Sequence, residues 1–277
     1  MEILRYAAFT SHPAGGNPAG VVLDATGASD AELQEVARQV GYSETAFLLP
    51  QPDAGMGVRY FSPLAEVPFC GHATIATAVA YAERHGPGRL DLDTAAGRVV
   101  VTTRAGADGP EATLVSVRPS VAELPEDPLA ELLRALRWEP GDLDPALPVR
   151  VGYAGAFHPI LAARSRQRLS ELDYDFDALQ ALMAREDWTT IDLVWREAPD
   201  VFHARNPFPP GGVVEDPATG AAAAAFGGYL RELDLVEPPA TVWVHQGDDL
   251  GRPGLLQMTI PAGRGGISVG GSAVRMG

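Results

Sequence analysis

The feature of this 277-residue chain that most constrains its fold is an internal repeat. The stretch EVPFCGHATIATAVAY, residues 66–81, is matched by EDPATGAAAAAFGGYL, residues 215–230. Both keep three residues in the same order, Pro68, Gly71 and Ala73 in the first and Pro217, Gly220 and Ala222 in the second. The offset, 217 minus 68, is 149 positions, a domain length, whereas solenoid repeats have periods of about 20 to 50 residues. We therefore expect two similar halves, 1–118 and 119–277, with a last strand free to cross to the first half.

Each repeated stretch predicts a turn followed by a helix that is apolar on every side, and such a helix belongs in a protein core. Around each helix the hydrophobic pattern predicts mainly strands, in the same order in both halves. Residues 118–144 are rich in Pro, Glu and Asp and are the expected linker, with a short helix at LAELLRAL. The expected fold class is α+β: two similar domains, each a mostly antiparallel sheet wrapped around a central apolar helix.

The charge of the chain favours a small-molecule partner. Asp and Glu outnumber Lys and Arg by 36 to 21, and the formal net charge of −15 opposes binding to nucleic acid or to an anionic membrane surface. No run approaches the roughly 18 apolar residues that span a bilayer, and the N-terminus lacks a basic region followed by an apolar one. We expect a cytoplasmic protein.

Several classes of chemistry are excluded by missing residues. The single cysteine, Cys70, rules out an internal disulfide and a multi-cysteine zinc site. All 21 basic residues are arginine, so there is no lysine for a pyridoxal phosphate Schiff base or a phosphate-binding P-loop. GxGxxG and HExxH are absent, and the six histidines are scattered without ligand spacing. We expect neither a metal nor a cofactor.

The starts of the two apolar helices are candidate binding points. Free N–H groups in the first turn of a helix favour an anion, and Gly71 lets a ligand approach them closely. If the halves are alike, both helix starts face a shared cleft that holds a carboxylate. The nearest polar side chains are Glu66, Cys70, His72 and Thr74 in the first half and Glu215, Asp216 and Thr219 in the second. For each of them a capping or turn role is an equal alternative.

Two further residues have competing interpretations. Glu44 lies between Ser43 and the apolar run TAFLLP, where partial desolvation would suit a general acid/base. An exposed Glu at the start of a strand is the alternative that the residues alone favour. Cys70 is either a nucleophile or base, or a small buried apolar residue, and the second is the more usual state of a lone cysteine.

Five segments in order, GGNPAGVVL, SETAFLLP, PFCGHAT, EDPATG and QGDDLGRP, resemble the phenazine biosynthesis PhzF-like isomerase/epimerase family over nearly the full length. The resemblance implies the diaminopimelate epimerase-like fold and cofactor-free proton transfer. It also implies that Glu44 is the catalytic acid/base and that His72 and Asp216 are its polar partners. We expect substrate binding at the two helix starts, by Gly71, Ala73, Thr219, Gly220 and Ala221.

The sequence departs from the family pattern at a few positions. Related epimerases use two cysteines, which align with Pro68 and Pro217, so a two-cysteine mechanism is unavailable. Ala221 stands where family members have a serine that contacts substrate, which puts the substrate in doubt. Leu250 and Gly254 replace a methionine and a serine without touching the implied proton transfer.

The predicted function is that of an isomerase or epimerase acting on a small carboxylated metabolite, either amino-acid-like or a cyclic diene. The alternative is a small-molecule-binding protein that keeps the cleft without catalysis. An oxidoreductase lacks any cofactor motif to support it. Association into a homodimer is left open.

Overall fold

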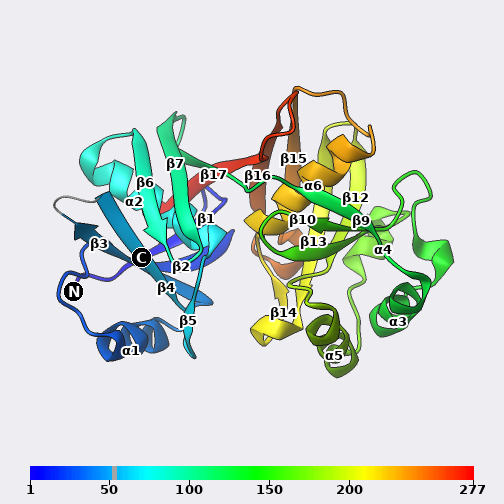
Figure 1. The fold of residues 1–277 in the computed structure, drawn as a ribbon, viewed down its shortest axis with the longest axis horizontal. Coiled ribbons are helices and arrows are strands. Elements are labelled where there is room, and N and C mark those ends of the chain that lie inside the picture. Colours follow the sequence, from blue (N-terminus) through cyan, green and yellow to red (C-terminus); the bar gives the residue numbers. More distant parts are fainter. Residues whose placement is uncertain (52–54) are drawn as a thin grey trace. The chain divides into compact units, whose positions relative to one another are not determined.

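The computed structural model describes residues 1–51 and 55–277, which form two compact units (Figure 1). Unit 1 is Met1–Val115 together with Gly270–Gly277, and unit 2 is Ser116–Val269. The boundary expected from the sequence lay at 118/119. The chain returns to unit 1 with its last residues, which is the crossing considered above.

Unit 1 is a ring of strands around one helix. Its elements are β1 (Leu4–Ala8), β2 (Asn17–Val22), α1 (Asp30–Val40), β3 (Glu44–Gln51), β4 (Gly55–Phe61), β5 (Glu66–Val67), α2 (Gly71–His85), β6 (Arg89–Thr94), β7 (Gly97–Gly106), β8 (Gly109–Val115) and β17 (Ser268–Arg275). The hydrogen-bonded neighbours run β1, β2, β3, β4, β6, β7, β8, β17 and back to β1. Pairing is parallel between β2 and β3 and between β4 and β6, and antiparallel for β1–β2, β3–β4, β6–β7, β7–β8 and β1–β17.

The helix inside this ring is α2. Small residues dominate its sequence GHATIATAVAYAERH, and its residues from His72 to Ala80 are all buried. Small side chains let strands approach from several directions, and α2 contacts β1, β2, β3, β7 and β8. Polar residues gather in its last turn as Arg84 and His85, and Gly86 follows with a φ of 86° that suits glycine.

Unit 2 repeats the order of elements. They are β9 (Ser120–Glu123), α3 (Glu126–Leu136), η1 (Pro140–Asp142), β10 (Arg150–Tyr153), β11 (Phe157–Ala162), α4 (Arg166–Ser170), α5 (Phe176–Glu186), β12 (Asp192–Ala198), β13 (Val201–Phe208), η2 (Pro209–Gly211), β14 (Val213–Asp216), α6 (Gly220–Glu232), β15 (Ala240–Gln246), η3 (Asp248–Leu250) and β16 (Gly254–Ile260). Pairing repeats too: β10–β11 is antiparallel, β11–β12 parallel, β12–β13 antiparallel, β13–β15 parallel and β15–β16 antiparallel.

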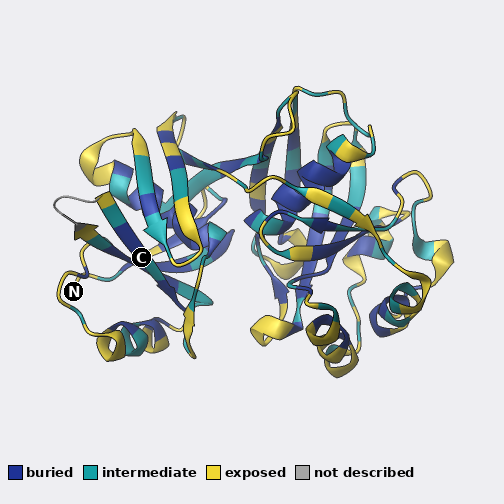
Figure 2. Ribbon diagram, viewed as in Figure 1, coloured by how far each residue is buried: buried dark blue, intermediate teal, exposed yellow. Residues whose placement is uncertain are grey.

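The repeat places the two central helices in register. Helix α2 begins at Gly71 and α6 at Gly220, and 220 minus 71 is again 149. A short strand precedes each helix, β5 in unit 1 and β14 in unit 2. In Figure 2, α6 is mostly dark blue, whereas α5 shows an exposed yellow side. The aligned sequences therefore form equivalent buried helices in the two units.

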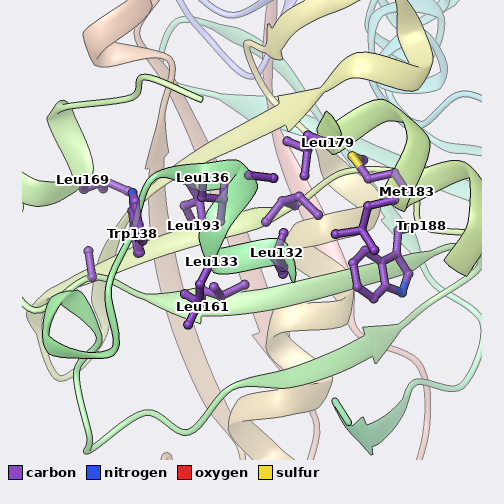
Figure 3. Packing of buried hydrophobic residues seen from close by; sticks show 14 residues of the cluster. Leu132, Leu133, Leu136, Trp138, Leu161, Leu169, Leu179, Met183, Trp188 and Leu193 are labelled. Atoms are coloured by element: carbon purple, nitrogen blue, oxygen red, sulfur yellow. The ribbon is translucent and has the colours of Figure 1, made fainter. Parts of the chain in front are cut away.

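The expected linker, 118–144, is instead part of unit 2. Its first segment is β9, which pairs antiparallel with β10. The expected short helix is α3, whose apolar face contributes Leu132, Leu133 and Leu136 to a buried cluster (Figure 3). Leu179, Met183, Trp188 and Leu193 come from α5 and the segment around β12. Charged residues cover only the outer side of α3, so a Glu- and Asp-rich composition did not mark a free linker.

Candidate active site

The start of α2 brings three reactive side chains together in unit 1. Cys70 is the N-cap of α2 and His72 is its second residue. Glu44 is the first residue of β3. Since β3 runs parallel to β2, with Glu44 opposite Ala19, the beginnings of both strands meet the beginning of the helix. The fold thus gathers residues that are far apart in the sequence.

The distances within this cluster are short. Nε2 of His72 lies 3.4 Å from Oε2 of Glu44, and Sγ of Cys70 lies 3.5 Å from the same oxygen. Sγ also lies 3.8 Å from Nε2 of His72. The side chain of His72 is 7% exposed and that of Glu44 is 17% exposed. Glu44 is therefore the member of the cluster that a ligand reaches most readily.

Hydrogen bonds orient the imidazole of His72. Nδ2 of Asn17 lies 3.2 Å from Nδ1 of His72, and Oγ of Ser43 lies 3.3 Å from Nε2. An amide NH₂ only donates, so with the Asn17 amide in this orientation Nδ1 accepts and Nε2 carries a proton. That proton is then available to Glu44 or Ser43. Neither Asn17 nor Ser43 was among the residues expected at the site.

One oxygen of Glu44 remains available. Both neighbouring donors, the thiol of Cys70 and the imidazole of His72, approach Oε2. Within the described ranges, 1–51 and 55–277, Oε1 accepts no hydrogen bond from the protein. Glu44 is partly buried and its carboxylate is held on one side, so it is not the exposed strand residue that the residues alone favoured.

The backbone at the start of α2 is open to a ligand at one residue and closed at another. A Cβ on Gly71 would meet no atom within 4 Å, so space is present beside its N–H group. Ala73, by contrast, has no exposed surface, because its side chain packs inside the ring of strands. The expected contact of Ala73 with substrate is therefore not available in this structure, and Ala73 is a packing residue.

The start of α6 in unit 2 carries a second polar network. The hydroxyl of Thr219 donates to Oδ2 of Asp216 at 2.7 Å. Gln246 accepts from the backbone N–H of Thr219 at 3.0 Å and donates to the carbonyl oxygen of Asp216 at 2.8 Å. Gly220 is buried, and Ala221 is half-buried as the second residue of α6. Gln246 therefore fixes this turn, and the sequence signal for it was the segment QGDDLGRP, of which Gln246 is the first residue.

Three of the other polar residues near the helix starts have a structural role in place of a role at the site. Thr74 donates to the carbonyl oxygen of Cys70 at 2.6 Å, within its own helix turn. Glu66 forms an exposed ion pair with Arg59. Glu215 forms a buried ion pair with Arg205, so it stabilises unit 2 and is not free to move protons. The expected cleft shared by both helix starts stays a prediction.

The cluster in unit 1 also has the composition of a metal site. Glu44, Cys70 and His72 each offer one ligand atom, and these atoms all lie within 4.8 Å of one another. In the part of the chain that the structure describes, this is the one group of three such residues. No spacing typical of metal ligands is visible along the sequence, because β3 and α2 contribute residues that are far apart along the chain.

None of the helices formed by the described residues is long and apolar enough to span a bilayer. This agrees with the absence of a long apolar run in the sequence.

Comparison with known proteins places these features in one family. The sequence signature described as phenazine biosynthesis-like protein matches residues 6–276. The uncharacterized isomerase YddE of Escherichia coli O157:H7 is 33% identical over 266 residues, covering 94% of this chain and 90% of the relative. The trans-2,3-dihydro-3-hydroxyanthranilate isomerase of Pseudomonas chlororaphis is 32% identical over 253 residues, covering 90% and 86%. The crystal structure of the Bacillus anthracis phenazine biosynthesis protein of the PhzF family superposes with a TM-score of 0.90 at 26% identity, covering 100% and 98%.

A mixed-sheet fold and isomerase relatives over nearly the whole chain define an enzyme of the isomerase class. Within that class the chain belongs to the phenazine biosynthesis-like protein family. The resemblance seen in the five sequence segments is thereby confirmed.

Proposed function

We propose that this isomerase moves a proton within a small carboxylated metabolite, without a cofactor, and that Glu44 is the acid/base that carries the proton. The observation that supports this most directly is the state of the Glu44 carboxylate. Oε2 is approached by Cys70 and His72, and Oε1 is left for an incoming C–H group. The substrate class is an amino-acid-like acid or a cyclic diene acid.

The proposed reaction needs no oxidant and no reductant. Oε1 of ionised Glu44 removes a proton from a carbon next to a conjugated or carboxylated centre. The electron pair of the broken C–H bond shifts through the adjacent double bond, and protonated Glu44 returns the proton to another carbon or to the other face of the same carbon. Substrate and product then have the same composition, as an isomerase requires. A positioned general acid/base accelerates such a step by about 10²- to 10⁴-fold.

His72 and the start of α2 support this step in different ways. The imidazole N–H at Nε2 points towards Glu44 and Ser43, so it holds the Glu44 carboxylate in one orientation. The free backbone N–H groups beside Gly71 suit the carboxylate of the substrate. His72 is therefore a positioning donor in this proposal, and Glu44 is the group that exchanges protons.

In unit 2 we assign supporting roles to the start of α6. Asp216 is held by Thr219 and Gln246, which suits a polar group that must keep one orientation. Half-buried Ala221 offers a bare side chain to the substrate where family members have a serine, and buried Gly220 begins the helix beside it. The repeat of strand order and pairing supports descent of both units from one duplicated domain of the diaminopimelate epimerase-like kind.

The test is exchange of hydrogen with solvent. Carboxylated candidates, including trans-2,3-dihydro-3-hydroxyanthranilate, proline-like amino acids and cyclic diene acids, are incubated with the enzyme in deuterated water and examined by mass spectrometry and NMR. A substrate gains one deuterium at the carbon that Glu44 protonates. Binding of several candidates without any exchange would favour the alternative, a binding protein on the same fold.

A further inference from the structure

We propose that Asn206, anchored by Asp192 and Thr190, is a positioning residue that fixes Asp216 in front of α6. The catalytic part of this inference, that the reaction depends on the position of Asp216, rests on the function proposed above. The structural part does not. It rests only on hydrogen bonds and strand pairing within unit 2.

Asp192 is the counterpart of Glu44 in the repeat. In unit 1 the parallel pair β2–β3 places Glu44, the first residue of β3, opposite Ala19. In unit 2 the equivalent pair β11–β12 places Asp192, the first residue of β12, opposite Ile160. The side chain of Glu44 is 17% exposed, whereas Asp192 has only 2% of its surface exposed. The carboxyl group of unit 2 is therefore closed off from a ligand and bonds inside its own unit.

Asp192 sets the direction of a buried chain of hydrogen bonds. Nδ2 of Asn206 donates to Oδ1 of Asp192 at 3.0 Å. This orientation of the amide leaves Oδ1 of Asn206 as an acceptor, and the hydroxyl of Thr190 donates to it at 2.7 Å. The same hydroxyl oxygen then accepts from Nδ1 of His158, 2.8 Å away. All four residues are buried, so each bond lost would leave a donor or an acceptor without water to replace its partner.

Asn206 connects the buried carboxyl group to the strand that carries Asp216. It is the residue of β13 that pairs with Asp216 of β14. Directly opposite residues of neighbouring strands project to the same face of a sheet, so Asn206 and Asp216 share the face on which Asp192 lies. Successive residues alternate between faces, so the buried ion pair of Arg205 with Glu215 belongs to the other face. The two faces of β14 are therefore held separately.

Backbone pairing is weak next to Asp216, which makes the side-chain anchor important. Pro207 follows Asn206 and has no N–H group to donate to the ladder. The register of β13 against β14 then shifts between Pro207 and Phe208, as at a bulge. Strand β14 has only four residues, and its first two are exposed. The position of Asp216 therefore depends on the side-chain bonds that hold Asn206.

The experiment measures amide hydrogen exchange of residues 213–219 by mass spectrometry, which needs no substrate. Asn206→Asp keeps an acceptor for Thr190 but places a second carboxyl group opposite Asp192. We expect the amides of 213–219 to exchange about tenfold faster or more in this variant. Adding Asp192→Asn restores an amide donor to the pair, with donor and acceptor exchanged. This double variant should return the exchange of 213–219 to the wild-type rate.

Leu133→Val is the matched control for a general loss of stability. Leu133 is buried in the cluster formed by α3 and α5, so this variant loosens unit 2 away from the polar network. It should not accelerate the exchange of 213–219 selectively. Unchanged exchange of 213–219 in Asn206→Asp would overturn the positioning role. Equal acceleration throughout unit 2 would overturn it as well, because Asn206 would then support the unit as a whole.

Turnover separates this inference from the proposed function. With the substrate identified by deuterium exchange, Asn206→Asp should lower kcat about tenfold with a smaller change in KM, and adding Asp192→Asn should restore kcat. A wild-type kcat in Asn206→Asp, despite faster exchange of 213–219, would overturn the catalytic part and leave the role of Glu44 untouched. If the wild type exchanges hydrogen on no candidate substrate, the function proposed above fails, and amide exchange still decides whether Asn206 holds Asp216.

Discussion

Nδ2 of Asn17, the first residue of β2, lies 3.2 Å from Nδ1 of His72, the second residue of α2. Through this contact a strand determines which ring nitrogen of the histidine carries the proton. Asn17 is buried, with 1% of its surface exposed, so water does not replace the amide. With the amide in this orientation, Nδ1 of His72 accepts and Nε2 faces Glu44 as the donor.

The first prediction concerns this contact. Asn17→Asp replaces the donor with an acceptor of the same shape, which favours a proton on Nδ1 and withdraws the Nε2 proton from Glu44 unless the ring becomes charged. We expect kcat to fall by about tenfold or more, with a smaller change in KM and an altered pH profile. The measurement is steady-state kinetics across pH. An unchanged pH profile would show that the tautomer of His72 does not matter for the reaction.

The second prediction tests Glu44 itself. Glu44→Gln keeps the shape of the side chain and removes the group that exchanges protons, so turnover and deuterium exchange should fall by about 10²- to 10⁴-fold. Thermal unfolding should change little, because Glu44 is partly exposed. Glu66→Gln is the control, since Glu66 precedes the same helix but pairs with Arg59 at the surface. Near-wild-type exchange by Glu44→Gln would remove Glu44 from the mechanism.

The third prediction follows from Asp192, a buried carboxyl group in unit 2. Burial raises the pKa of Asp192 to about 7, and the hydrogen bond from Nδ2 of Asn206 lowers it only in part. The folded chain therefore binds this proton at pH values where the unfolded chain, with a pKa near 3.8, has lost it. The contribution of this carboxyl group to stability therefore falls as pH rises from about 4 to about 7, by at most about 1.4 kcal/mol per pH unit.

Asp192→Asn cannot ionise, so it should remove this part of the pH dependence. Relative to wild type, the variant should gain stability as pH rises from 4 to 8. Burial also lowers the pKa of His158 to about 4, which reduces stability as pH falls below about 6.5, but both proteins share that effect. Urea unfolding at several pH values measures the difference in unfolding free energy between variant and wild type. The control Asp187→Asn, at an exposed residue, should leave the pH dependence of the unfolding free energy unchanged. Parallel curves of unfolding free energy against pH for Asp192→Asn and wild type would contradict the raised pKa of Asp192.

The fourth prediction concerns Ala221. Its counterpart in the repeat is His72, and each is the second residue of its helix. Ala221→Ser adds a hydroxyl at a half-buried position, where a new hydrogen bond is worth about 0.5 to 1.5 kcal/mol. We expect a shift in preference towards hydroxylated or carboxylated ligands with little change in fold. Calorimetry with a panel of cyclic acids measures this shift in preference, and Ala31→Ser, at an exposed residue, is the control. Identical affinity profiles for wild type and Ala221→Ser would mean that position 221 does not face the ligand.

Much of the fold could be predicted from the sequence because each of the two repeated stretches has a clear local pattern, a turn followed by an apolar helix. The spacing of Gly71 and Gly220 predicted the starts of two equivalent helices, and both helices begin there. Residues 118–144 were misread, because the composition of β9 and α3 resembles that of a linker. Their place in unit 2 depends on pairing with β10 and on apolar contacts with α5, which are distant in sequence.

The candidate residues at the starts of α2 and α6 could be named from the sequence, and their roles stay predictions, whereas their hydrogen-bond partners could not be named. Glu44, His72 and Asp216 lie next to conspicuous turns, and the resemblance assigned them. Asn17 and Ser43 reach His72, and Gln246 reaches Asp216, across tertiary contacts that leave no periodic signal in the sequence. The burial of Ala73 likewise depends on strands that surround α2 from distant parts of the chain.

The strand β17 has a consequence for how the protein is made. In unit 1, β17 is the neighbour of both β1 and β8, so the ring around α2 closes only with the last residues of the chain. During synthesis the first 115 residues emerge early but keep two open sheet edges until β17 has emerged. Open edges of this kind invite pairing with other chains. A nascent chain stalled or cut before residue 270 would leave the ring of unit 1 open, so completion of the first unit depends on a strand made about 150 residues later.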